Sequence, residues 1–367
     1  MARDRETARV LRWPEAGRER SPAVDVAARP GTSARSGPAP ERVLDRTLST
    51  APMMERTDRH CRYFLRLVAP NALLYTEMVT AAALKHGDRE RLLAFDPAEH
   101  PVALQLGGSD PDELAAAARH GAAAGYDEIN LNVGCPSDRV QAGCFGAALM
   151  LEPKRVAACV DAMRAAVDVP VTVKTRLGVD HHDSYEFLCD FVGTIADAGC
   201  ETVIVHARKA WLKGLSPKQN RDIPPLDYAR VHRLKRDFPD LEVILNGGLR
   251  DEAAALGELA HVDGVMLGRA AYDDPLLLAR LDAAIFAHEP VSPAAALERF
   301  FDYAERELSA GTRLRALTRH LMGVFAGRPG GRRWRRALSE WPRADDDLAT
   351  LAALRALAST LGRDRAA

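Results

Sequence analysis

The sequence predicts an α/β fold, a (β/α)8 TIM barrel followed by a small all-helical C-terminal domain. Eight short apolar or β-branched runs alternate with helical patterns between residues 49 and 270. After Pro290 the strand pattern stops and only helical patterns follow. A doubly wound sheet is the alternative, but no GxGxxG motif follows the first strand to support it.

The predicted strands are short runs rich in Val, Ile, Leu and Thr. They cover residues 49–53, 73–79, 101–107, 128–134, 170–176, 201–207, 242–248 and 264–270. Between most of them lie Ala-rich, charged stretches with helical periodicity, such as 110–125, 183–199 and 227–238. Four further helices are predicted at 293–308, 312–327, 331–341 and 346–361.

Three regions follow from this pattern. Residues 1–45 are rich in Arg, Pro, Ser, Gly and Ala without sustained periodicity, so they are predicted to be disordered. Residues 46–288 form the predicted barrel, and residues 289–367 form the predicted helical domain.

Composition excludes several classes of protein. The chain has 367 residues, of which 47% are apolar and 28% charged, as in ordinary globular proteins. No apolar run approaches the roughly 20 residues that span a bilayer, so a membrane protein is not expected. The six cysteines show no CxxC pair and no disulfide-like spacing, which favours a reducing, cytoplasmic setting over secretion or a zinc site. We expect a monomer without metal.

Charge is distributed unevenly along the chain. The net charge is −1, yet the segment from Gly311 to Arg336 holds eight arginines and no acidic residue. Such a basic segment fits a polyanionic partner, and the alternative is a solvated helix face.

Polar residues mark the carboxyl ends of the predicted strands, where the active site of this fold is built. Several uncommon types occur there, and buried polar groups on one rim favour a bound polar ligand. They are Pro52, Met53, Met54, Gln105, Asn132, Cys135, Lys174, Arg176, His206, Arg208, Asn246, Gly247, Gly248, Gly268 and Arg269. Glu77, inside the second strand, either orients a ligand or pairs with Lys174 or Arg176.

The last two strand ends indicate a phosphate. The Gly247-Gly248 pair permits close backbone approach, and Gly268-Arg269 opens the helix after the eighth strand, which is the usual phosphate site of this fold. Lys174 would place a cation near the ring of the ligand, where it would stabilise a reduced flavin. FMN therefore fits both ends of the site.

Cys135 stands at the tip of the fourth strand, directly before Pro136. A thiol in that position serves either as a proton donor or nucleophile, or as a small buried apolar residue. We interpret the second thiol nearby, Cys144, as a packing residue.

The order of motifs resembles that of the tRNA-dihydrouridine synthases, from about Thr50 to Arg336. The SPKQNR and GGRRWRR segments make the chain similar to the A-type subgroup. The motifs are APMM-x-x-TDRHCR, LLYTEMV, PVALQLGGSDP, YDEINLNVGCPSDRVQAGCFGA, PVTVKTRLG, IVHARKAWLKGLSPKQNR, NGG and DGVMLGR.

The resemblance implies FMN-dependent reduction of uridine to 5,6-dihydrouridine in tRNA, with NADPH as electron donor and positions 20 and 20a of the D-loop as targets. Cys135 would be the general acid that protonates C5 after hydride reaches C6. The residues that would hold FMN are Pro52, Met53, Met54, Gln105, Lys174, His206, Asn246, Gly247, Gly248, Gly268 and Arg269. Those that would touch tRNA are Asn132, Lys218, Arg221, Arg332 and Arg335.

Other interpretations remain. An FMN barrel that reduces a free pyrimidine or enone would explain the rim but not the basic segment. An RNA-binding protein without activity would explain the arginines but not Cys135 and Lys174. Trp334 either stacks on a nucleotide or anchors its helix to the core. His181 and His182 are expected to be solvent-exposed rather than metal ligands.

Overall fold

A computed structural model describes residues 44–137, 145–341 and 346–363. The predicted disorder of residues 1–45 therefore falls almost wholly outside the described residues, and Cys144 also lies outside them.

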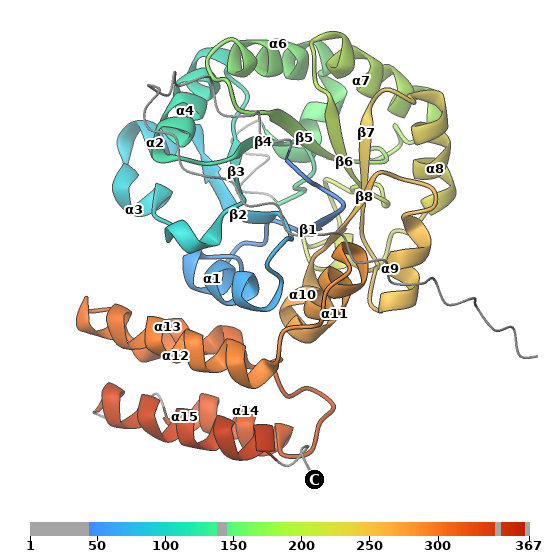
Figure 1. Cartoon of the computed structure of the whole chain (residues 1–367). Helices are drawn as coiled ribbons and strands as arrows, with labels where there is room; N and C mark the ends of the chain where they lie inside the picture. Colours follow the sequence, from blue (N-terminus) through green and yellow to red (C-terminus); the bar gives the residue numbers. More distant parts are fainter. Residues whose placement is uncertain (1–43, 138–144, 342–345, 364–367) are drawn as a thin grey trace, which may run out of the picture. The chain divides into compact units, whose positions relative to one another are not determined.

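The described chain contains one parallel sheet of eight strands, arranged in a ring (Figure 1). Neighbours follow the order β1-β8-β7-β6-β5-β4-β3-β2. The strands are β1 Leu48–Thr50, β2 Leu74–Thr80, β3 Val102–Gly107, β4 Glu128–Asn132, β5 Val171–Arg176, β6 Thr202–His206, β7 Glu242–Asn246 and β8 Gly264–Leu267. All eight predicted strands are present.

The ring closes between β1 and the residue before β2. Leu73 N–H donates to Leu48 O, and Thr50 N–H donates to Leu73 O, both at 2.9 Å. Because the sheet closes on itself, the predicted barrel is confirmed and the doubly wound alternative is wrong.

The first strand is shorter than predicted. It ends at Thr50, since Pro52 has no N–H with which to continue the ladder. The next N–H, of Met53, instead donates to Thr57 Oγ1 at 2.9 Å. This turn directs residues 51–54 across the carboxyl end of the barrel, where the site is built.

Helices follow the strands on the outside of the ring (Figure 1). They are α1 Arg59–Val68, α2 Ala81–His86, α3 Arg89–Leu93, α4 Pro111–Ala124, α6 Pro153–Arg164, α7 Tyr185–Asp197, α8 Tyr228–Asp237, α9 Glu252–Glu258, α10 Arg269–Asp273 and α11 Pro275–Phe286. The 3-10 turns are η1 Pro97–Glu99, η2 Gly146–Leu151 and η3 Gln219–Arg221. Asp110, Ser184 and Asp227 cap the N-termini of the three helices predicted in the barrel.

The C-terminal part is helical, as predicted. It contains α12 Pro293–Ser309, α13 Leu314–Thr318, η4 Arg319–Leu321, α14 Gly331–Glu340 and α15 Asp347–Arg363. The single helix predicted at 312–327 is wrong, because α13 and η4 end by Leu321. Gly323 then approaches the backbone of Asp273 so closely that a Cβ would lie 2.3 Å from its carbonyl oxygen, and Gly327 has a φ of 69°.

Trp334 anchors α14 to the core. Its side chain is fully buried, its Nε1–H donates to Leu321 O at 2.8 Å, and its ring meets Phe325 edge-on. Of the two interpretations of Trp334, stacking on a nucleotide is therefore wrong, because no face of the ring is exposed.

Side chains of α1 and the residue before it contact the C-terminal helices. His60 Nδ1 and Tyr303 OH lie 2.7 Å apart, and Arg59 pairs with Glu307 at 2.6 Å. Asp58 accepts from Arg319 at 2.5 Å. The boundary at residue 288 falls between α11 and α12 and stays a prediction. In the described part of the chain, no helix is long and apolar enough to cross a bilayer.

Candidate functional site

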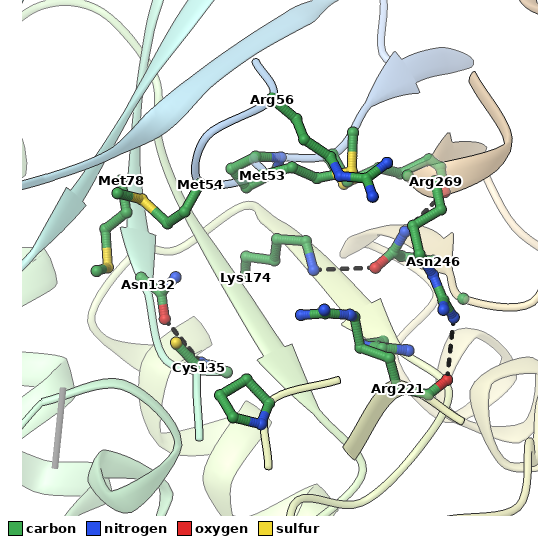
Figure 2. Close-up of a pocket in the computed structure, with 18 of the residues that line it drawn as sticks. Met53, Met54, Arg56, Met78, Asn132, Cys135, Lys174, Arg221, Asn246 and Arg269 are labelled. Atoms are coloured by element: carbon green, nitrogen blue, oxygen red, sulfur yellow. Dashed lines mark hydrogen bonds between the residues drawn. The ribbon is translucent and has the colours of Figure 1, made fainter. Parts of the chain in front are cut away.

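The carboxyl ends of the strands enclose a cavity of about 620 Å³ (Figure 2). This is the size of a small-molecule or cofactor site. All the residues predicted to hold the cofactor line it, namely Pro52, Met53, Met54, Gln105, Lys174, His206, Asn246, Gly247, Gly248, Gly268 and Arg269. Cys135, Asn132 and Arg221 line it as well. Their roles toward a ligand stay predictions.

The loop after β4 places the thiol of Cys135 at the cavity wall. Asn132 Oδ1 accepts hydrogen bonds from the backbone N–H of Gly134 at 3.1 Å and of Cys135 at 3.0 Å (Figure 2). Cys135 is half-buried, and its Sγ lies 3.5 Å from Ser137 Oγ. Asn132, predicted to touch tRNA, thus also holds the backbone of the predicted acid.

Lys174 reaches into the cavity from β5. Its Nζ donates to Asn246 Oδ1 at 3.0 Å, while Asn246 Nδ2 donates to Met266 O at 2.7 Å (Figure 2). Burial, with Arg176 beside it, lowers the pKa of Lys174 from 10.5 to about 7, although Cys135 opposes this. Among the described residues, Lys174 forms no ion pair with a carboxylate. This is expected of a group that binds an anionic ligand.

Other basic residues line the same cavity as Lys174. Burial, Arg176 and Lys174 hold the pKa of His206 well below its ordinary value, so His206 is neutral near pH 7. Burial lowers the pKa of Arg221, and the neighbouring Arg269 and Arg56 lower it further. Because these groups disfavour one another's charged forms, the cavity favours an anionic ligand.

Arg176, which also lines the cavity, links two of the loops around it. Its Nε donates to Gly134 O at 2.8 Å, and its Nη1 donates to Lys209 O at 3.1 Å and Asn220 O at 3.0 Å. Burial, only partly offset by Cys135, lowers its pKa to about 10. Arg176 therefore fixes the loop of Cys135 to the loop after β6.

The glycines predicted at the phosphate end have conformations that other residues rarely adopt. Gly247 and Gly248 have φ values of 109° and 75°. Arg269 lines the cavity there, but its Nη2 donates to Asp222 Oδ1 at 2.7 Å. A phosphate would therefore share this guanidinium with Asp222. Helix α10 has only five residues, so its dipole adds little.

Two of the described residues predicted at the rim lie behind the lining instead. Glu77 accepts from Glu55 N–H, while Lys174 and Arg176 donate to other groups, so among the described residues neither of the predicted ion pairs forms. Arg208 donates to the carbonyl oxygens of Pro224 and, at 3.3 Å, Asp222. Both side chains hold loops that border the cavity.

Some lining residues were not predicted. Arg56 lies 4.6 Å above the ring of Tyr272 and donates to Asp273 Oδ1 at 3.2 Å, at the cavity edge. Its position, two residues after Met54, is the only signal in the sequence. Others, which come from β2, β8 and the loops after β6 and β7, are Met78, Met266, Pro217, Leu249 and Arg250.

The remaining predicted tRNA contacts lie on the surface. Lys218 is exposed in the loop before η3, and Arg332 and Arg335 are exposed on α14. Part of the basic segment has a structural role, because Arg319 pairs with Asp58. His181 and His182 are exposed, as predicted. Within the described residues, no group of three or more metal-ligating side chains gathers.

Comparison with known proteins gives one consistent result. The family model for dihydrouridine synthase (Dus) matches residues 49–359. The tRNA-dihydrouridine(20/20a) synthase of Escherichia coli (strain K12) is 59% identical over 295 residues, which are 80% of this chain and 85% of that protein. The enzyme of the same name from Shewanella oneidensis is 57% identical over 299 residues, 81% of this chain and 89% of that protein. That from Vibrio cholerae is 58% identical over 296 residues, with coverage of 80% and 90%.

Proposed function

Because the chain belongs to the dihydrouridine synthase family, we propose that it reduces uridine to 5,6-dihydrouridine in tRNA. The observation that carries this proposal is the cavity, in which the half-buried thiol of Cys135 and the cationic side chain of Lys174 line one space of about 620 Å³. A proton donor and an anion-binding group in one cavity suit the addition of a hydride and a proton to a polarised double bond.

The proposed cofactor is FMN, reduced by NADPH. The donor set supports it, since Lys174, Arg221 and Arg269 favour an anion and the cavity also has apolar lining from Met53 and Met266. The backbone at Gly247, Gly248 and Gly268 with Arg269 would hold the phosphate, and Lys174 would face the ring. When bound, FMN would supply the hydride that C6 of the uracil ring receives.

The chain itself would supply the proton. C5 of uracil takes up a proton once C6 has received hydride, and Cys135 Sγ–H is the donor that we propose. Asn132 would keep this thiol in place, because its side chain accepts from the backbone of Cys135 at 3.0 Å. The loop of Cys135 is held a second time where Arg176 donates to Gly134 O.

A base inside folded tRNA must leave its stack to enter the cavity, at a cost of a few kcal/mol. Contacts with the tRNA backbone would offset this cost. We assign them to Lys218, Arg221, Arg332 and Arg335, which are all exposed. Since the relatives are named for positions 20 and 20a, we propose these D-loop uridines as the targets.

Replacing Arg332 and Arg335 together by alanine should weaken tRNA binding and reduce the slope of log K against log salt by up to about 2, because each lost phosphate contact removes about 0.7–0.9. Binding would be measured between 50 and 200 mM salt. A control pair, Arg119→Ala with Arg236→Ala, removes exposed arginines from α4 and α8. The control pair should keep the slope of the unmodified protein. If the variant without Arg332 and Arg335 kept that slope as well, these arginines would not contact tRNA.

The second candidate is an FMN reductase of a free pyrimidine or enone, which the same cavity would serve. A visible spectrum of the purified protein, followed by mass spectrometry of tRNA incubated with it and NADPH, separates the two. Flavin bands with a D-loop fragment heavier by about 2 Da, one hydride and one proton, support our proposal. Flavin bands with unmodified tRNA favour the second candidate. A protein that binds no flavin would contradict both.

A further inference from the structure

Hydrogen bonds run through the interior of the barrel, starting at the cavity wall. They connect five buried polar side chains, which we call the barrel network: Asn132, Gln105, Asn130, Thr172 and Glu128. The first two line the cavity, and the other three lie deeper among β4 and β5. The mechanism proposed above gives these three residues no role.

Each member of the network donates to the next. Asn132 Nδ2 donates to Gln105 Oε1, and Gln105 Nε2 donates to Asn130 Oδ1, both at 2.8 Å. Asn130 Nδ2 donates to Thr172 Oγ1 at 2.8 Å, and this hydroxyl donates to Glu128 Oε1 at 2.6 Å. All the bonds therefore point in one direction, from the cavity toward Glu128.

At the end of the network away from the cavity, the carboxylate of Glu128 determines this direction. Glu128 is fully buried and pairs with the guanidinium of Arg46, whose Nε lies 2.7 Å from Oε2. Tyr75 OH donates to Glu128 Oε1 at 2.5 Å. An ionised carboxylate only accepts hydrogen bonds, so the Thr172 hydroxyl must donate to it and accept from Asn130.

At the cavity end of the network, the loop of Cys135 requires the same direction of hydrogen bonding. Asn132 Oδ1 accepts from the N–H of Gly134 and Cys135, so its amide nitrogen must face Gln105. Gln105 then presents Oε1 to Asn132 and Nε2 to Asn130. The donors and acceptors at both ends are satisfied by one arrangement of the amides.

The arrangement also determines what the cavity offers a ligand. Each amide nitrogen carries two hydrogens, and the network uses one from Asn132 and one from Gln105. Asn132 Oδ1 already accepts twice. The remaining N–H groups of these two lining residues suit acceptors, such as the carbonyl oxygens of a pyrimidine or flavin ring.

We propose that Glu128 and Thr172 are positioning residues, which act through Asn130 to fix the cavity amides. By fixing Asn132 they would also fix the backbone of Cys135. This inference rests on the proposed function for the identity of the ligand, whereas the arrangement of the loop does not depend on it. Nearby groups in the same interior, such as Thr202, would contribute to stability alone.

Thr202 provides a matched control. Its hydroxyl donates to Glu242 Oε2 at 2.7 Å, and Arg46 Nη1 donates to the same oxygen at 2.9 Å. Thr172 and Thr202 are thus buried strand threonines that each donate to a carboxylate paired with Arg46. Only Thr172 lies on the path to the cavity.

The experiment compares Thr172→Val, Thr172→Ser and Thr202→Val in the full chain. The affinity for FMN is measured by fluorescence, and the rate of Cys135 alkylation by iodoacetamide is measured by peptide mass spectrometry. We expect Thr172→Val to weaken FMN binding about tenfold, because an orphaned buried group disturbs the amides, and to change the alkylation rate at least about threefold. Thr172→Ser and Thr202→Val should stay within about twofold of the unmodified protein.

Equal effects of Thr172→Val and Thr202→Val on both readouts would overturn the proposal, since the role of Thr172 would then be structural only. If Thr172→Val does not fold, the pair Thr172→Ser and Thr172→Ala isolates the hydroxyl. Neither readout requires tRNA. A protein that leaves uridine unreduced, but whose Cys135 alkylation changes with Thr172→Val, would contradict the proposed function and support the network.

Discussion

Replacing Cys135 by alanine should lower the rate of uridine reduction by about 10²–10⁴-fold, the usual contribution of a general acid. FMN binding and flavin reduction by NADPH should continue, because the groups proposed to hold FMN lie on other strands. The thiol lines the cavity and is only half-buried, so its loss leaves little space to collapse and removes the proposed proton donor. Single-turnover reduction of tRNA by the pre-reduced enzyme measures this step directly.

A matched control is Cys189→Ala. Cys189 is also half-buried, but it lies on α7, outside the cavity lining among the described residues. Its replacement should leave single-turnover reduction within about twofold, as for a substitution away from the site. Normal turnover of Cys135→Ala would assign the proton to another donor, and water would be the first to consider.

The barrel itself could be predicted because its strands are short and almost wholly buried. A run such as Val-Ile-Val at 203–205 packs on both faces, so it is apolar throughout, and helical periods separate it from the next run. Element ends were less predictable where backbone contacts decide them. The end of η4 depends on Gly323 meeting Asp273, fifty residues earlier, and no local pattern reports such a contact.

Much of the candidate site could also be predicted, because a parallel barrel brings every strand end to one rim. That rule alone places Gln105, Lys174, His206 and Asn246 together. The rule fails for side chains in long loops. Arg269 pairs with Asp222 only because the loop after β6 folds back over the cavity.

The buried end of the barrel network, at Glu128, was the part of the structure that the sequence predicted least. Glu128 and Arg46 are 82 positions apart, and either would ordinarily be predicted on the surface. Burial lowers the pKa of Arg46, but Glu128 and Glu242 raise it above its ordinary value, so the guanidinium stays charged. A buried ion pair of this kind depends on three strand starts meeting at the amino-terminal end of the barrel, which only the closed sheet establishes.

The affinity for FMN should fall as pH rises above 7, by up to about tenfold per pH unit, because one proton is taken up on binding. The group responsible is Lys174, whose pKa burial and Arg176 lower from 10.5 to about 7. Above pH 7 the unliganded site holds a neutral amine, and an anionic ligand must restore the ammonium. The second ionisation of a phosphate lies near pH 6, so the ligand's own charge stays constant between pH 7 and 9.

Lys174 should have the opposite influence on folding. Its pKa is lower in the folded chain than in the unfolded one, so between about pH 7 and 10.5 the unfolded chain binds the additional proton. The contribution of this residue to the free energy of unfolding therefore rises with pH in that window. Ligand affinity and stability should thus change in opposite directions with pH, which separates loss of the ammonium from simple unfolding.

Fluorescence titration with FMN at pH 6, 7, 8 and 9 measures the first effect. Lys174→Met should bind FMN more weakly than the unmodified protein at pH 6 and about equally at pH 9, with an affinity that no longer depends on pH between 7 and 9. Lys174→Arg keeps its charge throughout this range and should also show little pH dependence. If the unmodified protein had one affinity from pH 7 to 9 and bound FMN no more tightly than Lys174→Met, the assignment of Lys174 to the flavin ring would have to be withdrawn. One affinity together with weaker binding by Lys174→Met would mean that Lys174 is already charged before FMN binds.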